Sequence, residues 1–560
     1  MPLGTQTFSE IITRNMVYAD KTQYIFDLIR TKKACFLSRP RRFGKSLLIS
    51  TMYELFSGNK DLFKDTWIYN TDYDFKKYPI LRFKMNYSNI INNNDLIELI
   101  YADVIKFGSK YNINITQKNL GQALDTLIES IFEITHQKLV ILVDEYDAPI
   151  TKYLNNLELA ESNSLILHDF YTTLKNNDEF IKFIFVTGIT RFSLTYFDSG
   201  PNNLIDITLH PKFEGICGFT IDEFDSLFEK YIDKALKYYK NNQIMQYIKN
   251  KTDLRNRIID YYNGYSWGGS LKILNPYSIV NFFDTYEFLN YWYNIGRPKY
   301  LSKLIQEKPW EYIRPELDKY ISDDLSRVNI GSFSPGAILF QSGYLTIDKK
   351  IVQDNNENHH DININIDGEG EDLDIYYKLK IPNFEIEKSY RKDLLKTIFK
   401  ENIHQALTTN KSIYNALLLK DYKELETIFS SIFASVSYLQ QLNDIEMSII
   451  GEKHFHALIQ VFLQGKGFKI FTEMTNYLGR SDLIVELEEN IFVIIEIKYI
   501  KSETKDSKAS IIKLLNKTAS EGLEQISNHK YSEPFKNKIN KIIEMSMAIY
   551  GRGHLVIKFA

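Results

Sequence analysis

The segment "FLSRPRRFGKSLLIS", residues 36–50, decides the fold of the N-terminal half of the chain. It ends like a phosphate-binding loop, in Gly44-Lys45-Ser46, but Arg39 stands where the pattern G-x-x-x-x-G-K-[ST] has its first glycine. The short apolar run "ACFLS" before it predicts a buried strand, and the apolar stripe of "KSLLISTMYELF" after it predicts a helix. In this context, backbone N–H groups at the helix N-terminus cradle phosphates.

A second segment supports a nucleotide site. "LVILVDEYD" is a continuous apolar run that ends in Asp144-Glu145, 99 residues after Lys45, and it predicts a strand buried on both faces of a parallel sheet. Asp144 and the hydroxyl of Ser46 can hold Mg²⁺, and Glu145 can orient or activate the attacking water as a catalytic residue. The GKS triplet alone is a weak signal, and a helix cap plus a charged strand end is the alternative.

A third segment, "FVTGITRFS", follows another predicted buried strand. Thr187 ends that strand, where a polar group can sense the γ-phosphate, and Arg191 can stabilise the charge that develops there. A surface arginine in a loop is the alternative for Arg191. The predicted nucleotide-binding residues are therefore Arg42, Phe43, Gly44, Lys45, Ser46, Asp144, Thr187 and Arg191.

Composition excludes several classes of protein. The net charge of −3 over 560 residues gives no global basic field, so a nucleic-acid site must be a local patch. Two cysteines, Cys35 and Cys217, are too few for a disulfide framework or a cysteine zinc cluster, and they suit a reducing cytosol. The N-terminus has no apolar core of a signal peptide, and no run reaches 18 apolar residues. We expect a cytoplasmic protein that does not contact membranes.

The order of patterns along the chain predicts a multidomain α/β protein of two to four domains. Buried strands alternate with helices first, a helical and aromatic stretch follows, and mixed segments complete the chain. Within them, residues 353–374 are acidic and rich in asparagine, which predicts a mobile surface loop. The predicted domains are an ATPase-like domain (1–215), a helical lid (216–330), a mixed connector (331–440) and a C-terminal α/β domain (441–560).

The C-terminal domain contains a second candidate site, in "NYLGRSDLIVELEENIFVIIEIKYIKS" (476–502). Asp482 opens one predicted strand, and Glu496 and Lys498 share one face of the next strand by the period of two. Two carboxylates and a lysine brought together in this way form a hard-oxygen site for Mg²⁺, and the lysine can position a water. Charged strand ends are common, so this pattern alone is weak.

A predicted helix before the hairpin adds Glu452 as a further metal ligand. Its apolar stripe, at helical spacing, includes Glu452 and His456, and a lone carboxylate on a buried face is costly unless a cation accompanies it. We interpret His456 as a packing residue rather than a ligand. The predicted metal ligands of the chain are Ser46 and Asp144 at the first site and Glu452, Asp482 and Glu496 at the second.

Together these segments carry a resemblance. "YADKTQYI", "FLSRPRRFGKSLL", "LVDEYDAPI", "TGITRFS" and "YNGYSWGG…LNPYSIVNF" resemble the prokaryotic AAA-ATPase-like family, whose members pair a P-loop ATPase with a C-terminal PD-(D/E)XK nuclease-like domain. The resemblance implies that Arg39 is a trait of the family rather than a defect of the loop. It implies ATP and Mg²⁺ as cofactors, and Asp482, Glu496 and Lys498 as the catalytic residues of a nuclease.

Three functions remain open from the sequence. The first is an ATPase coupled to a Mg²⁺-dependent nuclease that acts on nucleic acid, with DNA favoured over RNA. The second is a nucleotide-driven switch whose C-terminal domain binds nucleic acid or protein without cutting. The third is a motor that remodels DNA or protein, for which we identify no arginine finger, so the oligomeric state is open.

Overall fold

The computed structural model describes residues 1–192, 204–243, 245, 248–296, 301, 303–305, 312, 319–332, 334–353, 359–360, 374–399, 410–435, 444–472, 475–476, 479–487, 491–502, 507–531 and 541–560. The chain forms two compact units. The N-terminal unit comprises residues 1–301 and 315–387, and the C-terminal unit comprises residues 302–314 and 388–560. The four predicted domain ranges stay predictions.

A five-stranded parallel sheet lies at the centre of the N-terminal unit, in the order β2-β3-β4-β1-β5. The three predicted apolar runs form β1, β3 and β4, and every residue of β1 and β3 is buried, as a sheet covered on both faces requires. The order places β4 between β1 and β3. The strands are β1 (Ala34–Ser38), β2 (Ile80–Lys84), β3 (Leu139–Asp144), β4 (Ile181–Gly188) and β5 (Leu204–Asp206).

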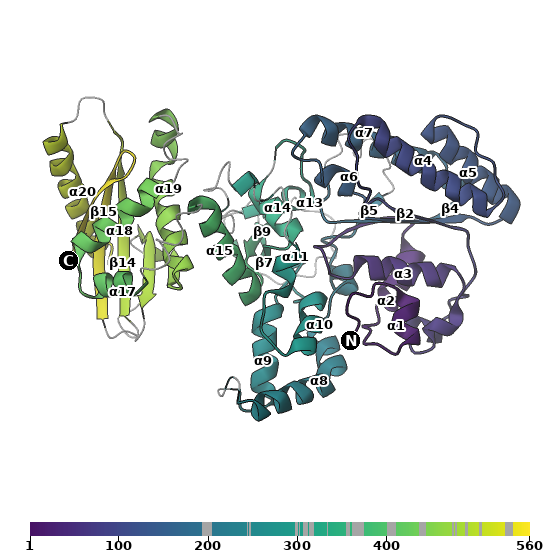
Figure 1. Ribbon diagram of the computed structural model, residues 1–560, viewed down its shortest axis with the longest axis horizontal. Helices are drawn as coiled ribbons and strands as arrows, with labels where there is room; N and C mark the ends of the chain where they lie inside the picture. The colour runs from purple at the N-terminus through teal and green to yellow at the C-terminus, as the bar shows by residue number, and fades with distance from the viewer. Residues whose placement is uncertain are drawn as a thin grey trace. The chain divides into compact units, whose positions relative to one another are not determined.

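Helices cover both faces of this sheet (Figure 1). On one side lie α1 (Phe8–Thr13), α2 (Thr22–Thr31) and α3 (Lys45–Phe56), and on the other lie α4 (Asn93–Lys110), α5 (Leu120–Thr135) and α7 (Leu157–Asn176), which pack against one another. The short α6 (Ala148–Thr151) follows β3. The 3₁₀ turns are η1 (Lys60–Phe63), η2 (Trp67–Asn70), η3 (Asp178–Phe180) and η4 (Pro211–Ile216).

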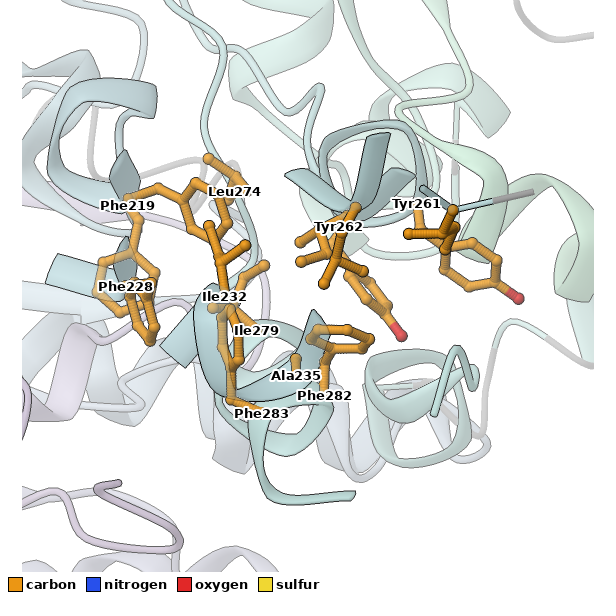
Figure 2. Close-up of a cluster of buried hydrophobic side chains, with 14 of the residues drawn as sticks. Phe219, Phe228, Ile232, Ala235, Tyr261, Tyr262, Leu274, Ile279, Phe282 and Phe283 are labelled. Carbon is orange, nitrogen blue, oxygen red and sulfur yellow. The ribbon is translucent and has the colours of Figure 1, made fainter. Parts of the chain in front are cut away.

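The predicted helical stretch forms α8 (Ile221–Asn241), α9 (Lys251–Tyr262), α10 (Pro276–Thr285) and α11 (Tyr291–Gly296). These helices share an aromatic core of their own, shown in Figure 2. One stripe of α8 supplies much of it, because Phe224, Phe228, Ile232, Ala235 and Tyr239 recur at helical spacing and are all buried. The abundance of aromatic residues therefore reflects packing here.

A four-stranded antiparallel sheet, β6-β9-β7-β8, completes the N-terminal unit. Of the predicted loop at residues 353–374, Gln353 ends β7 and His359–His360 pair with it as β8, whereas residues 354–358 and 361–373 lie outside the described residues. The elements are β6 (Lys319–Ile321), α13 (Ser322–Ser326), α14 (Pro335–Ser342), β7 (Thr346–Gln353), β8 (His359–His360) and β9 (Asp374–Lys380).

The C-terminal unit is built on a mixed sheet in the order β10-β13-β14-β15-β16. β13 and β14 form the predicted antiparallel hairpin, and β15 runs parallel to β14 after α20, which packs on β14, β15 and β16. Its helices are α17 (Asn410–Leu418), α18 (Tyr422–Ser435), α19 (Asp444–Gly465) and α20 (Lys508–Asn528), together with most of α15 (Phe384–Phe399), which begins in the N-terminal unit. The strands are β10 (Lys469–Thr472), β11 (Thr475–Asn476), β12 (Gly479–Arg480), β13 (Leu483–Leu487), β14 (Ile491–Ile500), β15 (Lys541–Tyr550) and β16 (His554–Phe559).

Together, the parallel sheet of the N-terminal unit, the helices α8 to α11 and the mixed sheet of the C-terminal unit confirm a multidomain α/β fold with a helical middle region. Among the helices that the structure describes, none combines the length and the apolarity needed to cross a membrane.

Candidate functional site

The phosphate-type loop lies between the buried end of β1 and the start of α3. Its backbone is left-handed at Arg42 (φ 67°) and at Gly44 (φ 102°), the residue that caps α3. At Gly44 this conformation favours glycine, because an L side chain there is strained. The turn leaves the first N–H groups of α3 at the loop, the arrangement that binds anions.

Arg39, which replaces the first glycine of the pattern, is a structural residue. Its side chain is fully buried, and the guanidinium lies 4.1 Å from the centre of the Trp267 ring. The guanidinium donates to the carbonyl oxygens of Ser38 (2.9 Å), Thr208 (2.9 Å) and Phe213 (3.2 Å). Burial lowers the pKa of Arg39 to about 10. This arginine therefore joins the first residues of the phosphate loop to the segment that follows β5.

The loop opens on a cavity of about 680 Å³. Arg41 and Arg42, both exposed, lie on its wall with Lys45 and Ser46, while Arg39 is not among the lining residues. Nζ of Lys45 is buried and donates to the carbonyl oxygens of Arg39 (2.7 Å) and Pro40 (2.9 Å). Burial lowers the pKa of Lys45, and the charge of Asp144 opposes that effect. Phe43, a predicted binding residue, is fully buried and also borders the cavity.

The acidic side of the cavity comes from the end of β3. Asp144 and Glu145 both line it, Asp144 buried and Glu145 half-buried in a left-handed conformation (φ 54°). On the neighbouring β4, the hydroxyl of Thr187 donates to Oδ1 of Asp144 over 3.0 Å. The structure thus brings Lys45, Ser46, Asp144 and Glu145 to one cavity, whereas Thr187 contacts Asp144 without lining the cavity, and the roles of these residues stay predictions.

Arg191 lies elsewhere. Its guanidinium forms an ion pair with Asp206 at 2.5 Å, and it does not line the cavity. The sequence had left a loop arginine as the alternative for this residue.

Asp147 is a further residue of this site that the sequence analysis missed. It lines the cavity, is buried, and accepts hydrogen bonds from the N–H groups of Ile189 (3.1 Å) and Thr190 (2.9 Å) after β4. Burial raises its pKa to about 6. The hydroxyl of the adjacent Tyr146 accepts from the N–H of Phe192 (3.1 Å). The only sequence signal was the position of both residues in "DEYD", directly after the strand.

Residues far from the loop in sequence complete the wall. The N-terminal segment (Pro2–Gln6), Cys217 and Tyr277 line the cavity, as does Lys21, whose Nζ pairs with Glu223 at the start of α8 (2.6 Å). Periodicity gives no signal for such contacts, because they join separate elements; Lys21 and Glu223 are 202 residues apart.

The second candidate site lies on the β13–β14 hairpin. Oδ2 of Asp482 accepts from the N–H of Ile497 (2.8 Å), and Nζ of Lys498 donates to Oε1 of Glu496 (2.8 Å). Oε2 of the buried Glu496 has no hydrogen-bond partner among the described residues. Burial first, and then the charge of Asp482, raises the pKa of Glu496 to about 7. Two carboxylates held together with an unsatisfied buried oxygen fit a divalent cation.

Glu452, on α19, is placed differently from the prediction. The residue is exposed rather than on the buried face of the helix, although partial burial of its carboxyl and the charge of Asp482 raise its pKa. Nε2 of His456 lies 2.9 Å from the carbonyl oxygen of Asp482, which agrees with a packing role. In the described part of the chain, no three His, Cys, Asp or Glu side chains are arranged to hold a metal ion as they stand.

Gln525 and Tyr531 lie beside this hairpin. Gln525 belongs to α20, whereas Tyr531 follows the end of that helix, and Nε2 of Gln525 donates to the Tyr531 hydroxyl over 3.2 Å. The negative charges of Glu496 and Asp482 contribute to the raised pKa of Tyr531, after burial.

Comparisons with known proteins find one family match within each unit. Residues 2–197 match the AAA-ATPase-like family, described as "Predicted AAA-ATPase", and residues 450–559 match the PD-(D/E)XK nuclease superfamily. A protein of Azotobacter chroococcum mcd 1, described as "Uncharacterized protein in vnfD 5'region", is 28% identical over 497 residues, which cover 88% of each chain. No solved structure matches this chain significantly.

Proposed function

Because this chain joins an AAA-ATPase-like domain to a PD-(D/E)XK nuclease superfamily domain, we propose that it is an ATPase coupled to a Mg²⁺-dependent nuclease. The observation that carries the first half is the convergence of Lys45, Ser46 and Asp144 on one cavity large enough for a nucleotide. The substrate of the second half is a nucleic acid, with DNA favoured over RNA.

At the first site, Lys45 can exchange its two loop carbonyls for phosphate oxygens, which pairs its buried charge with an anion. Ser46 and Asp144 supply oxygen ligands for Mg²⁺, and Glu145 orients the attacking water. Thr187 holds the carboxylate of Asp144 in place. Mg²⁺ bound at either site supplies positive charge that stabilises the reacting phosphate.

At the second site, Asp482 and Glu496 are the ligands, with Glu452 close enough to be felt electrostatically by both. Oε2 of Glu496 is the open position for a cation. Lys498, already held by Oε1 of Glu496, is oriented to hold the attacking water or the non-bridging oxygen of the scissile phosphate.

The test is cleavage of plasmid, linear duplex, single-stranded DNA and RNA with Mg²⁺, with and without ATP. We expect Lys498→Ala to abolish cutting, and Lys501→Ala, a lysine just beyond the same strand, to retain it. We expect Lys45→Ala to abolish ATP hydrolysis, and the exposed-surface variant Lys251→Ala to retain it. Cutting that survives Lys498→Ala contradicts the proposed nuclease site.

One observation favours a second candidate, a nucleotide-driven switch whose C-terminal unit binds nucleic acid or protein without cutting. Among the described residues, the carboxylates do not stand as a ready group of three metal ligands. ATP hydrolysis that depends on Lys45, with no cutting of any substrate, supports this candidate over the nuclease.

A further inference from the structure

The start of α15 is seated in the segment "YNGYSW" of the N-terminal unit. Asn383 caps the helix by accepting from the N–H of Ile386 (3.2 Å), and its Nδ2 donates to the carbonyl oxygen of Asn263 (2.9 Å). Gly264 has a φ of 108°, and a Cβ there would lie 2.0 Å from the carbonyl oxygen of Pro382. Glycine therefore permits this close approach, which fixes the first turn of α15 on the N-terminal unit.

Glu385, the second residue of α15, is fully buried at this seat. Oε2 accepts from the hydroxyl of Ser278 (2.8 Å), and Oε1 accepts from the N–H groups of Trp292 (2.7 Å) and Tyr293 (3.2 Å). Among the described residues, no lysine or arginine pairs with this carboxyl, and its burial raises the pKa to about 7. Three donors compensate the burial of this acid, and they tie the first turn of α15 to α10 and α11.

Two of the three partners of Glu385, Trp292 and Ser278, lead to the nucleotide cavity. The indole N–H of the buried Trp292 donates to the carbonyl oxygen of Arg41, in the phosphate loop, over 2.8 Å. Ser278 lies in the first turn of α10, next to Tyr277, which lines the cavity. Glu385 is thus one hydrogen bond from the helix that walls the cavity and two from the loop itself.

The helix that begins at this seat also crosses the boundary between the units. α15 runs from Phe384 to Phe399, and the boundary falls between residues 387 and 388. A helix is a rigid element, so a shift of its first turn is carried along its length.

We propose that Glu385 is a positioning residue that couples the occupancy of the nucleotide cavity to helix α15, and through it to the C-terminal unit. This inference rests on the proposed function, since it requires a ligand in the cavity. An anion bound at the loop shifts the Arg41 peptide and thereby Trp292, which is hydrogen-bonded to it. A ligand that contacts Tyr277 shifts the neighbouring Ser278. Both effects meet at one carboxyl group.

Hydrogen exchange of the full chain, with and without a non-hydrolysable MgATP analogue, tests this coupling. In the wild type we expect ligand to slow amide exchange about fivefold or more both in the loop (residues 41–46) and in the second part of α15 (residues 388–399). In Glu385→Gln, which keeps the size of the side chain, we expect the loop to respond as before and the response of α15 to be lost.

Two further variants control the experiment. Trp292→Phe breaks the chain of hydrogen bonds at its other end, and we expect it also to lose the response of α15; it carries the test if Glu385→Gln does not fold. Tyr239→Phe removes a buried hydroxyl that donates to a backbone carbonyl oxygen, that of Tyr286, in the same unit, and we expect it to keep the response.

The outcomes separate this inference from the proposed function. An α15 response that persists in both Glu385→Gln and Trp292→Phe, or its absence in a wild type whose loop is protected, overturns the coupling alone. Absence of any ligand protection at the loop overturns the proposed ATP site and the coupling together.

Discussion

The two candidate sites are built by opposite means. The cavity of the N-terminal unit gathers a loop after β1, acids after β3 and walls contributed by residues 216–219 before α8, by α10 and by the N-terminal segment. The site of the C-terminal unit lies on a single hairpin, where Asp482, Glu496 and Lys498 fall within 17 residues of sequence. The first is therefore sensitive to distant substitutions that the second should ignore.

The difference also appears in how polar groups are satisfied. At the cavity, Lys45, Asp144 and Asp147 already have hydrogen-bond partners in the protein. On the hairpin, one oxygen of Glu496 is left without a partner in the described part of the chain. Hydrogen bonds from the protein already hold the polar groups of the first site in place, whereas the second keeps a buried carboxylate oxygen that Lys498 does not reach.

The largest effect should come from the hairpin itself. We expect Asp482→Asn to lower the rate of nucleic-acid cleavage on the order of 100-fold or more, because it removes a negative charge from the cation site. The amide oxygen can still accept from the N–H of Ile497, so the hairpin should fold. Glu486→Gln, on the same strand, is the control and should cut at the wild-type rate. Equal loss of cleavage in both variants would contradict a site centred on Asp482.

The next largest effect should come from Arg39, which anchors the phosphate loop to a distant segment. We expect Arg39→Met to lower the free energy of unfolding of the N-terminal unit by about 4 kcal/mol, because three buried carbonyl oxygens lose their donor. Calorimetry of the full chain should show the lower transition temperature. Arg30→Met, at an exposed arginine, is the control. An unchanged transition for Arg39→Met would show that the loop does not depend on this distant anchor.

The same contrast decides what the sequence could predict. β1 and α3 occupy the predicted segments, and the hairpin pattern placed Glu496 beside Lys498, because strand and helix periods are local. The wall from Lys21 and the bond from Trp292 to Arg41 could not be predicted, since 251 residues separate that last pair and no period links them. Glu452 is exposed although it shares a helical spacing with apolar residues, because period alone does not say where a buried face ends.

A pH dependence follows from Glu385. Burial raises its pKa in the folded state from 4.5 to about 7, so the folded protein keeps a proton that the unfolded chain releases. The contribution of this proton to the free energy of unfolding is fully present below pH 4.5. It is lost as the pH rises through 7, which lowers the free energy of unfolding by about 3 kcal/mol.

Calorimetry of the N-terminal unit at pH 5 and pH 8 measures this effect. Glu385→Gln has no carboxyl to titrate, so its stability relative to the wild type should improve on going to pH 8. Glu10→Gln, at a surface ion pair, should not change the pH dependence. A wild type and a Glu385→Gln variant with the same pH dependence would show that this acid is ionised throughout.

The smallest effect compares two helix caps, one in each unit. The Thr220 hydroxyl accepts from the N–H of Glu223 at the start of α8 (3.2 Å), and the Ser507 hydroxyl accepts from the N–H of Ser510 at the start of α20 (3.2 Å). We expect Thr220→Ala and Ser507→Ala each to lower the stability of its own unit by about 1 kcal/mol.

Only the first of these caps should affect a site. Glu223 holds Lys21 in the wall of the cavity, so loosening the start of α8 in Thr220→Ala should weaken nucleotide binding. Because the loss of stability is small, we expect the affinity to fall by only about twofold to threefold. Ser507→Ala should leave cleavage unchanged, because among the described residues the cap at Ser507 bonds to Ser510 and to no carboxylate of the hairpin. Titration of nucleotide and cleavage rates measure the two variants. If the two variants weakened nucleotide binding and cleavage equally, the cavity would be no more sensitive to a distant substitution than the hairpin site is.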